Sequence, residues 1–307
     1  MATAATHHRT ATVPDLHELQ SSWILSMRAQ RKSPATIEQY EIGLRLFLRW
    51  CDEHGHQAVI DRQLTQLFIA DLLETVQPAT AALRLQAMKQ FGHWLVEEGE
   101  IEENPLIGVK APKLDTKIVE CLTEDELRDL FAACKGKEFR DRRDEAIVRL
   151  LAETGMRAGE ILRLTVDDVD LTRGILAIRK AKTGQGRLVP FGPQTGQAVD
   201  RYIRARRTHR LAATPALLLG DNTRGTIAYH GMRNAIMMRA EQAGIKNFHL
   251  HKLRHTAASR WLAAGGSEGG LMAVAGWSNR NMIDRYTRAT AGERAAAEAR
   301  KLNLGDL

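Results

Sequence analysis

A short non-helical segment divides this chain into two halves that must fold separately. Residues 104–120, NPLIGVKAPKLDTKIVE, contain two prolines and several lysines and show no helical period. Proline breaks regular helices and central strands, because it lacks a backbone N–H and its ring fixes φ. The segment therefore predicts an extended linker over residues 105–120, with one domain on each side. A chain of 307 residues is long enough to bury two hydrophobic cores.

The first half predicts a small bundle of helices over residues 14–104. Ser33 and Pro34 supply an N-cap and a first-turn proline. The apolar residues that follow recur at helical spacing: Ile37, Tyr40, Leu44, Phe47, Leu48 and Cys51. Two more helices are predicted, at residues 63–75 and 78–99. Because such amphipathic helices can bury their apolar stripes only against one another, a bundle follows.

The second half predicts helices together with one small antiparallel sheet, over residues 121–307. Thr123 and Glu126 form a capping-box pattern at its start. Two β-rich runs, Ile175–Lys180 and Arg187–Phe191, flank the turn sequence TGQG and predict a hairpin. Further helices are expected near residues 193–210, 230–243, 251–263 and 267–275. The expected fold is therefore mainly α, with two domains, of which the second is mixed α+β.

The charge balance favours an anionic partner. The chain carries 44 lysines and arginines against 37 aspartates and glutamates, and its sequence pI is about 9.5. Nucleic acid is the simplest partner for such a charge. The three cysteines, Cys51, Cys121 and Cys134, lie far apart with no CxxC pair, which argues against a zinc ribbon or a disulfide framework. With neither a long apolar run nor a signal-peptide core, the sequence predicts a cytoplasmic protein without membrane contacts.

Four short stretches in the second half carry residues suited to phosphoryl chemistry. In chain order these residues are Arg157 in TGMRAGE, Lys182 in AKTG, His251 and Arg254 in HLHKLRH, and Trp277 and Tyr286 in AGWSNRNMIDRYT. Each has a structural alternative when taken alone: a surface arginine, a solvated turn lysine, or a core ring. Taken together and in this order, the donors suit a crowded, dianionic phosphoryl transition state, and the tyrosine supplies an oxygen nucleophile.

The histidine-rich stretch also raises the alternative of a metal site. His251, Arg254 and His255 fall on one face of a predicted helix, and histidines four residues apart can both reach a zinc ion. Lys252, however, stands where an HExxH motif has its glutamate, and an arginine on the same face repels a dication. We therefore expect no metal.

These stretches resemble the boxes of the tyrosine recombinases, the family of phage integrases and Xer-type recombinases. The resemblance lies in TGMRAGEILRLTVDDVDL, AKTGQGRLVPF, HLHKLRHTAASRWL and VAGWSNRNMIDRYT, and in SPATIEQYEIGLRLFLRW and NPLIGVK of the first half. It implies a SAM-like, core DNA-binding bundle at residues 14–104 and a catalytic domain at residues 121–307. One box departs from most members, which have histidine at the position of Trp277; there the chain resembles Cre recombinase, which also has tryptophan.

The resemblance implies a site-specific recombinase that cuts and rejoins DNA through a 3′-phosphotyrosine intermediate and a Holliday junction. It assigns six catalytic positions: Tyr286 as the nucleophile, Arg157 and Arg254 on the non-bridging oxygens, Trp277 as a hydrogen-bond donor, His251 as the proton acceptor and Lys182 as the general acid. An indole cannot shuttle a proton, which argues against an acid–base role at position 277. Glu160 is expected to orient Arg157 or His251, with a plain surface glutamate as its alternative. The phosphotyrosine ester stores the energy of the broken bond, so no cofactor is expected.

The same resemblance implies the partners: double-stranded DNA with an inverted-repeat core site, a homotetramer on two duplexes, and an accessory directionality factor. Residues 292–307, with Leu302, Leu304 and Leu307, are expected to dock on a neighbouring protomer, or else to pack on their own domain or fray. The run RYIRARRTHR at 201–210 either tracks the DNA backbone or forms a solvated helix face. A nucleoid-associated protein of bacterial or phage origin is expected, without an additional N-terminal domain.

Two other functions are compatible with parts of this pattern. A type IB topoisomerase uses the same phosphotyrosine chemistry, but the helical first domain argues against it. A DNA-binding regulator that has lost catalysis is the alternative from another class, and the six competent catalytic positions argue against it. The sequence leaves open the target site and the genetic role, whether integration, excision, dimer resolution or transposition.

Overall fold

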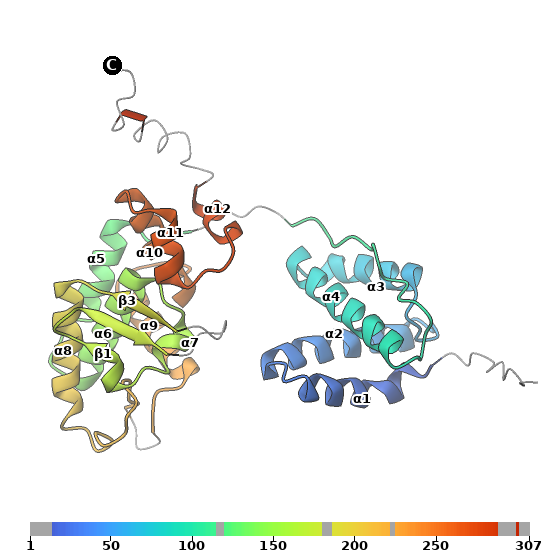
Figure 1. The fold of residues 1–307 in the computed structure, drawn as a ribbon, viewed down its shortest axis with the longest axis horizontal. Coiled ribbons are helices and arrows are strands. Elements are labelled where there is room, and N and C mark those ends of the chain that lie inside the picture. The colour runs from blue at the N-terminus through green and yellow to red at the C-terminus, as the bar shows by residue number, and fades with distance from the viewer. Residues whose placement is uncertain (1–13, 115–119, 180–185, 222–224, 288–298, 301–307) are drawn as a thin grey trace, which may run out of the picture. The chain divides into compact units, whose positions relative to one another are not determined.

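The computed structural model describes residues 14–114, 120–179, 186–221, 225–287 and 299–300 of the chain (Figure 1). The chain forms two compact units, residues 1–117 and 118–307, and each has a hydrophobic core of its own. The described parts are mainly helical with one small antiparallel sheet, which confirms the predicted fold class. No helix among the described residues has the length and apolar character needed to cross a membrane.

The first unit is a bundle of helices that begin at clear sequence signals. Its helices are α1 (Leu16–Ala29), α2 (Pro34–Glu53), α3 (Arg62–Thr75) and α4 (Pro78–Glu97). The side chains of Asp15, Ser33 and Asp61 accept backbone N–H groups at the starts of α1, α2 and α3. Such caps satisfy donors that the first turn of a helix leaves unpaired.

Aromatic rings fill the core between these helices. Trp23 of α1 lies against Phe91 of α4 with ring centroids 5.0 Å apart, and Phe47 of α2 meets Phe68 of α3 at 5.4 Å. Buried rings of this size bring a large apolar area out of water. The two long helices, α2 and α4, pack directly on each other.

The chain after α4 remains attached to the first unit as far as Val109. The amide of Asn104 donates to the carbonyl of Lys89 at 3.1 Å, and its oxygen accepts the N–H of Leu106 at 3.0 Å. Leu106 and Val109 are buried in the same core as the aromatic rings. The first residues of the segment expected to be a linker are therefore anchored, whereas residues 115–119 lie outside the described part of the chain.

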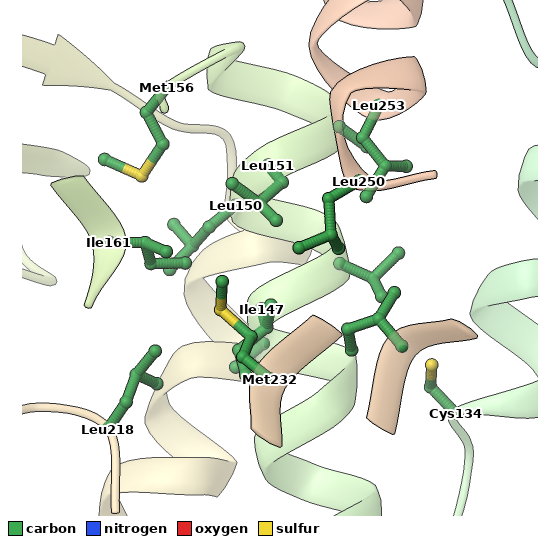
Figure 2. Close-up of a cluster of buried hydrophobic side chains, with 14 of the residues drawn as sticks. Cys134, Ile147, Leu150, Leu151, Met156, Ile161, Leu218, Met232, Leu250 and Leu253 are labelled. Carbon is green, nitrogen blue, oxygen red and sulfur yellow. The ribbon is translucent and has the colours of Figure 1, made fainter. Parts of the chain in front are cut away.

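The second unit is built around α6, a helix that is buried on nearly every side. Its longer helices are α5 (Glu124–Ala133), α6 (Phe139–Thr154), α8 (Pro193–Arg206), α9 (Tyr229–Gln242) and α10 (Leu250–Ala263). Helices α8 and α10 pack against α6. Figure 2 shows Ile147, Leu150 and Leu151 of α6 among Met232 of α9 and Leu253 of α10. Each such side chain contributes about 1.5–3 kcal/mol through burial.

A small antiparallel sheet lies beside this helical core. Its strands are β1 (Val169–Asp170), β2 (Ile175–Ile178) and β3 (Arg187–Pro190), in the order β1-β2-β3. In the β2–β3 ladder, Ile178 pairs with Arg187. The predicted pairing of the two β-rich runs is confirmed, and the short strand β1, which the sequence did not predict, adds a third strand to the small sheet.

Two left-handed glycines stop helices just before predicted catalytic residues. Gly155 (φ +60°) ends α6 two residues before Arg157, which caps the short helix α7 (Ala158–Ile161). Gly276 (φ +65°) ends α11 (Glu268–Ala275) immediately before Trp277. Glycine adopts this conformation without the strain that a side chain would add. Helix α12 (Asn281–Thr287) then carries Tyr286.

Candidate active site

Helix α10 carries the best-buried arginine of the predicted site. Arg254 is 4% exposed, and its guanidinium donates to two backbone carbonyls, those of Gly155 and Ala275, the latter at 2.9 Å. Burial, together with the positive charge of Arg157, lowers the pKa of Arg254 to about 10. The geometry thus brings two guanidinium groups close together, an arrangement that an anion would stabilise.

Arg157 holds the second guanidinium beside the first. Its Nη1 donates to Glu160 Oε1 at 3.0 Å, and its Nη2 donates to the carbonyl of Gly276 at 2.9 Å. These two hydrogen bonds hold the guanidinium in place, while the side chain, which is 36% exposed, remains in contact with solvent. Planar guanidinium groups fixed in this way suit bidentate binding of phosphate oxygens.

Glu160 lies beneath Arg157 and is almost completely buried. Its carboxylate accepts the backbone N–H of Arg157 at 2.8 Å and the Arg157 guanidinium, and it also forms a paired contact with Arg187, at 3.0 Å (Nη1–Oε1) and 2.8 Å (Nη2–Oε2). Burial by itself would raise the pKa of Glu160, but the hydrogen bonds and charges of Arg187 and Arg157 outweigh it and lower the pKa to about 2. The carboxylate is therefore an ionised anchor for Arg157, and a surface position is excluded by its 2% exposure.

Trp277 presents a buried donor at the centre of the site. The residue is 6% exposed, and within the described part of the chain its indole Nε1 has no hydrogen-bond partner. The guanidinium carbon of Arg254 lies 5.1 Å from the centre of the indole ring, in a cation–π contact. A buried N–H without a partner costs free energy, and a catalytic role is one physical reason for which such a group is kept.

Tyr286 lies against this tryptophan and against a histidine of α10. Its ring stacks on Trp277 with centroids 5.6 Å apart and an interplanar angle of 16°. Its hydroxyl forms a hydrogen bond with Nδ1 of His255, and the rings of His255 and His251 meet edge to face at 4.4 Å. The tyrosine hydroxyl is therefore in contact with a group that can accept its proton.

The structure brings together five of the six predicted catalytic residues, whereas the sixth and most of the predicted docking segment lie outside the described residues. Arg157, Arg254, Trp277 and Tyr286 converge, and His251 adjoins them through His255. Lys182 lies outside the described residues, as do residues 292–298 and 301–307 of the predicted docking segment, which include its three leucines. No cluster of metal-ligating side chains occurs in the part of the chain that the structure describes.

Sequence reasoning did not assign a role to two residues of this site, His255 and Arg187. His255 falls one turn after His251 on the same helix face, and that spacing was the signal that could have singled it out. Arg187 begins a strand, and nothing in its local sequence indicates a partner 27 residues earlier.

The chain matches two family profiles. Residues 120–293 match the profile described as "Phage integrase family", and residues 21–99 match "Phage integrase, N-terminal SAM-like domain". The SAM-like fold predicted for the first domain is thereby confirmed.

Curated relatives and a solved structure show the same similarity. "Tyrosine recombinase XerC" of Bacillus subtilis (strain 168) is 30% identical over 261 residues, which cover 83% of this chain and 84% of the relative. The protein of the same description from Pelotomaculum thermopropionicum is 28% identical over 295 residues, covering 91% of this chain and 96% of the relative. The fold also resembles that in "Crystal structure of a lambda integrase tetramer bound to a Holliday junction", with a TM-score of 0.69, 15% identity, and coverage of 90% of this chain and 83% of that one.

Proposed function

The chain belongs to the phage integrase family, and from that premise we propose that Tyr286 is the nucleophile with which it cuts DNA. The protein is a site-specific DNA recombinase of the tyrosine type, which breaks and rejoins strands through a 3′-phosphotyrosine intermediate and a Holliday junction. The individual residue roles below are our proposal.

One observation carries the assignment of the nucleophile. The hydroxyl of Tyr286 is hydrogen-bonded to a histidine, and its ring stacks on a tryptophan that also contacts Arg254. A phenol has an unperturbed pKa near 10, so attack on a phosphate needs both a proton acceptor and an electrophile made more reactive by nearby donors. The convergence of both kinds of group on one tyrosine supports the proposal.

The donors act on the non-bridging oxygens of the scissile phosphate. Arg157 and Arg254 bind these oxygens, and Trp277 adds a hydrogen bond from its buried indole N–H. The support is that both guanidinium groups are fixed by backbone carbonyls and that the indole donor has no other partner among the described residues. Donors held in place before the reaction stabilise developing charge without reorganising.

The proton of Tyr286 passes to the histidine pair of α10. His255 touches the hydroxyl through Nδ1, and His251, the position of the family's histidine, lies edge-on to His255. In the tautomer in which Nδ1 is the acceptor, a neutral imidazole can take up the proton of a phenol that donates to it. We assign acceptance of the proton to the pair, with His255 in direct contact.

The leaving group receives its proton from Lys182 in this proposal. As the bond from the Tyr286 oxygen to phosphorus forms, the bond from phosphorus to the 5′ oxygen breaks, and Lys182 protonates that oxygen as a general acid. The product is a 3′-phosphotyrosine ester with a free 5′-hydroxyl. Because a 5′-hydroxyl from a second duplex can attack this ester in the reverse sense, rejoining needs no ATP.

The larger assembly follows from the family and is also proposed. The domain at residues 14–104 and the catalytic domain at residues 121–307 close around a duplex at an inverted-repeat core site. Four protomers exchange strands between two duplexes, with residues 292–307 docking on a neighbour. The support is that a lambda integrase of similar fold forms a tetramer on a Holliday junction. Action at the nucleoid and an accessory directionality factor belong to the same proposal.

Covalent capture of DNA tests the nucleophile. The protein is incubated with a library of nicked inverted-repeat duplexes, and DNA that stays attached through detergent is sequenced. We expect wild type and Tyr229→Phe, a control at an exposed tyrosine of α9, to capture DNA, and Tyr286→Phe to bind DNA without capturing it. Capture by Tyr286→Phe would overturn the assignment. Binding without capture by all three proteins would instead favour a DNA-binding regulator.

A further inference from the structure

Three arginines from three different elements hold the end of helix α11. The carbonyl of Val274 accepts a hydrogen bond from Arg187 Nε at 2.8 Å. The next two carbonyls along the chain accept from the other two arginines: Ala275 from Arg254 Nη2 and Gly276 from Arg157 Nη2, each at 2.9 Å. The last carbonyls of a helix lack partners within the helix and carry partial negative charge, so cations bind them favourably. Arg157 and Arg254 already have roles in the proposed function, but Arg187 has none.

Arg187 is bound on two sides and is nearly buried, with a side chain that is 11% exposed. Its two terminal nitrogens pair with both oxygens of Glu160, and its Nε reaches the carbonyl of Val274. The guanidinium also lies so close to Gly276 that a Cβ atom at that glycine would be 2.8 Å from the Arg187 Cζ atom. The side chain therefore fixes the distance between Glu160 and the turn that leads into Trp277.

The contact with Glu160 also sets the charge that Arg157 can offer to a phosphate. Glu160 is shared between Arg187 and Arg157, so Arg187 neutralises much of the carboxylate. Without Arg187, the buried carboxylate would have Arg157 as its one remaining cationic partner among the contacts described. The Arg157 guanidinium would then be drawn toward Glu160 and away from the non-bridging oxygens, because charge-assisted pairs strengthen when one partner is buried.

We propose that Arg187 is a positioning residue of the recombination site: it holds Arg157 through Glu160 and holds Trp277 through the end of α11, without touching the scissile phosphate. This inference rests on the proposed function. It requires that the loss of Arg187 slows strand cleavage itself, and not merely that it weakens the fold. Misplacing a catalytic group by about 1 Å can cost on the order of a hundredfold in rate.

A matched control exists in the same unit. Arg239 on α9 is 12% exposed, pairs with Asp141 at 2.7 Å and Asp144 at 3.1 Å, and donates to the carbonyl of Ala133 at 3.0 Å. It resembles Arg187 in burial and in its partners, but it bonds to α5 and α6 rather than to the predicted catalytic residues. Losing it should destabilise the unit without moving Arg157 or Trp277.

The test measures single-turnover cleavage by the full-length protein on the nicked duplex that wild type captures. Four proteins are compared: wild type, Arg187→Gln, Arg187→Lys and Arg239→Gln. For each, the rate constant of covalent adduct formation, the final adduct amplitude, the Kd for the duplex and the Tm are determined. The amplitude reports the active fraction, whereas the rate constant reports the geometry of active molecules.

We expect Arg187→Gln to lower the rate constant at least about tenfold while Kd changes less than about threefold. Arg187→Lys should recover part of the rate, because it keeps the charge but not the paired geometry. Arg239→Gln should lower Tm or amplitude and leave the rate constant unchanged. A rate constant for both Arg187 variants equal to that of Arg239→Gln would overturn the inference. Should Arg187→Gln fail to fold, the rate constants of Arg187→Lys and Arg239→Lys are compared instead, and equal values would overturn the inference.

The outcome separates this inference from the proposed function. If wild type forms no adduct that depends on Tyr286, the proposed function fails. If wild type forms that adduct and the Arg187 variants form it equally fast, the proposed function stands and only the role of Arg187 is refuted.

Discussion

Replacing Glu160 with glutamine should destabilise the second unit strongly at pH 7 and much less in acid. Burial raises the pKa of Glu160, but hydrogen bonds from Arg187 and Arg157 outweigh it and bring the pKa to about 2, against an ordinary value of 4.5. That difference corresponds to about 3 kcal/mol of stability. Because the folded-state pKa is depressed, this stability is fully present above pH 4.5 and is lost as the pH falls toward 2. At pH 3 about 1.4 kcal/mol remains.

Hydrogen exchange measured by mass spectrometry reports the stability of the second unit separately from that of the first. Opening free energies are taken from peptides of α6 and α10, in a urea series at pH 7 and at pH 3, for wild type and Glu160→Gln. Glu241→Gln, at an exposed position on α9, is the control and should change stability by less than about 0.5 kcal/mol. A wild-type-to-variant difference that is the same at both pH values, or below about 1 kcal/mol at pH 7, would refute the reasoning.

Three other substitutions follow from single contacts. His255→Ala should slow adduct formation by at least about tenfold, and more than His251→Ala does, because His255 contacts the hydroxyl; single-turnover rates in the opposite order would make His251 the acceptor. Arg206→Met should lower the free energy of unfolding by about 2–4 kcal/mol in a urea titration, since the buried guanidinium donates to backbone carbonyls of the loop after α8; an unchanged midpoint would contradict this. Gly43→Ala should destabilise the first unit by about 1–3 kcal/mol, because the new Cβ would lie 2.5 Å from that of Ala87 on α4; a higher Tm would contradict this.

Helix boundaries and the hairpin were predictable because their signals are local. The hydroxyl of Ser33 accepts the N–H of Thr36, and Thr123 and Glu126 form both bonds of the capping box. Each signal involves residues three positions apart, and such a contact forms whatever the rest of the chain does.

The environments of the arginines were not predictable, because their partners are remote in sequence. The run at residues 201–210 was expected to be a solvated face or to track DNA. Arg201 instead pairs with Glu145 at 3.0 Å, and Arg206 is buried and donates to backbone carbonyls. Periodicity identifies a charged face, but it does not indicate which acidic side chain or loop carbonyl the fold will bring there. The role of Arg187 was missed for the same reason.

The hydrogen-bond partners of a buried arginine indicate whether its role is structural or whether its charge is available to bind an anion. Burial lowers the pKa of Arg239, but its hydrogen bonds with Asp141 and Asp144 outweigh burial and raise it. Arg254 is held by backbone carbonyls, which orient a guanidinium without cancelling its charge, and burial together with the charge of Arg157 lowers its pKa to about 10. Two neighbouring cations held in this way repel each other, and a phosphate bound between them would relieve that repulsion. Binding of a DNA phosphate should therefore raise the pKa of Arg254. It should also stabilise the second unit, because the bound anion relieves the repulsion between the two guanidinium groups.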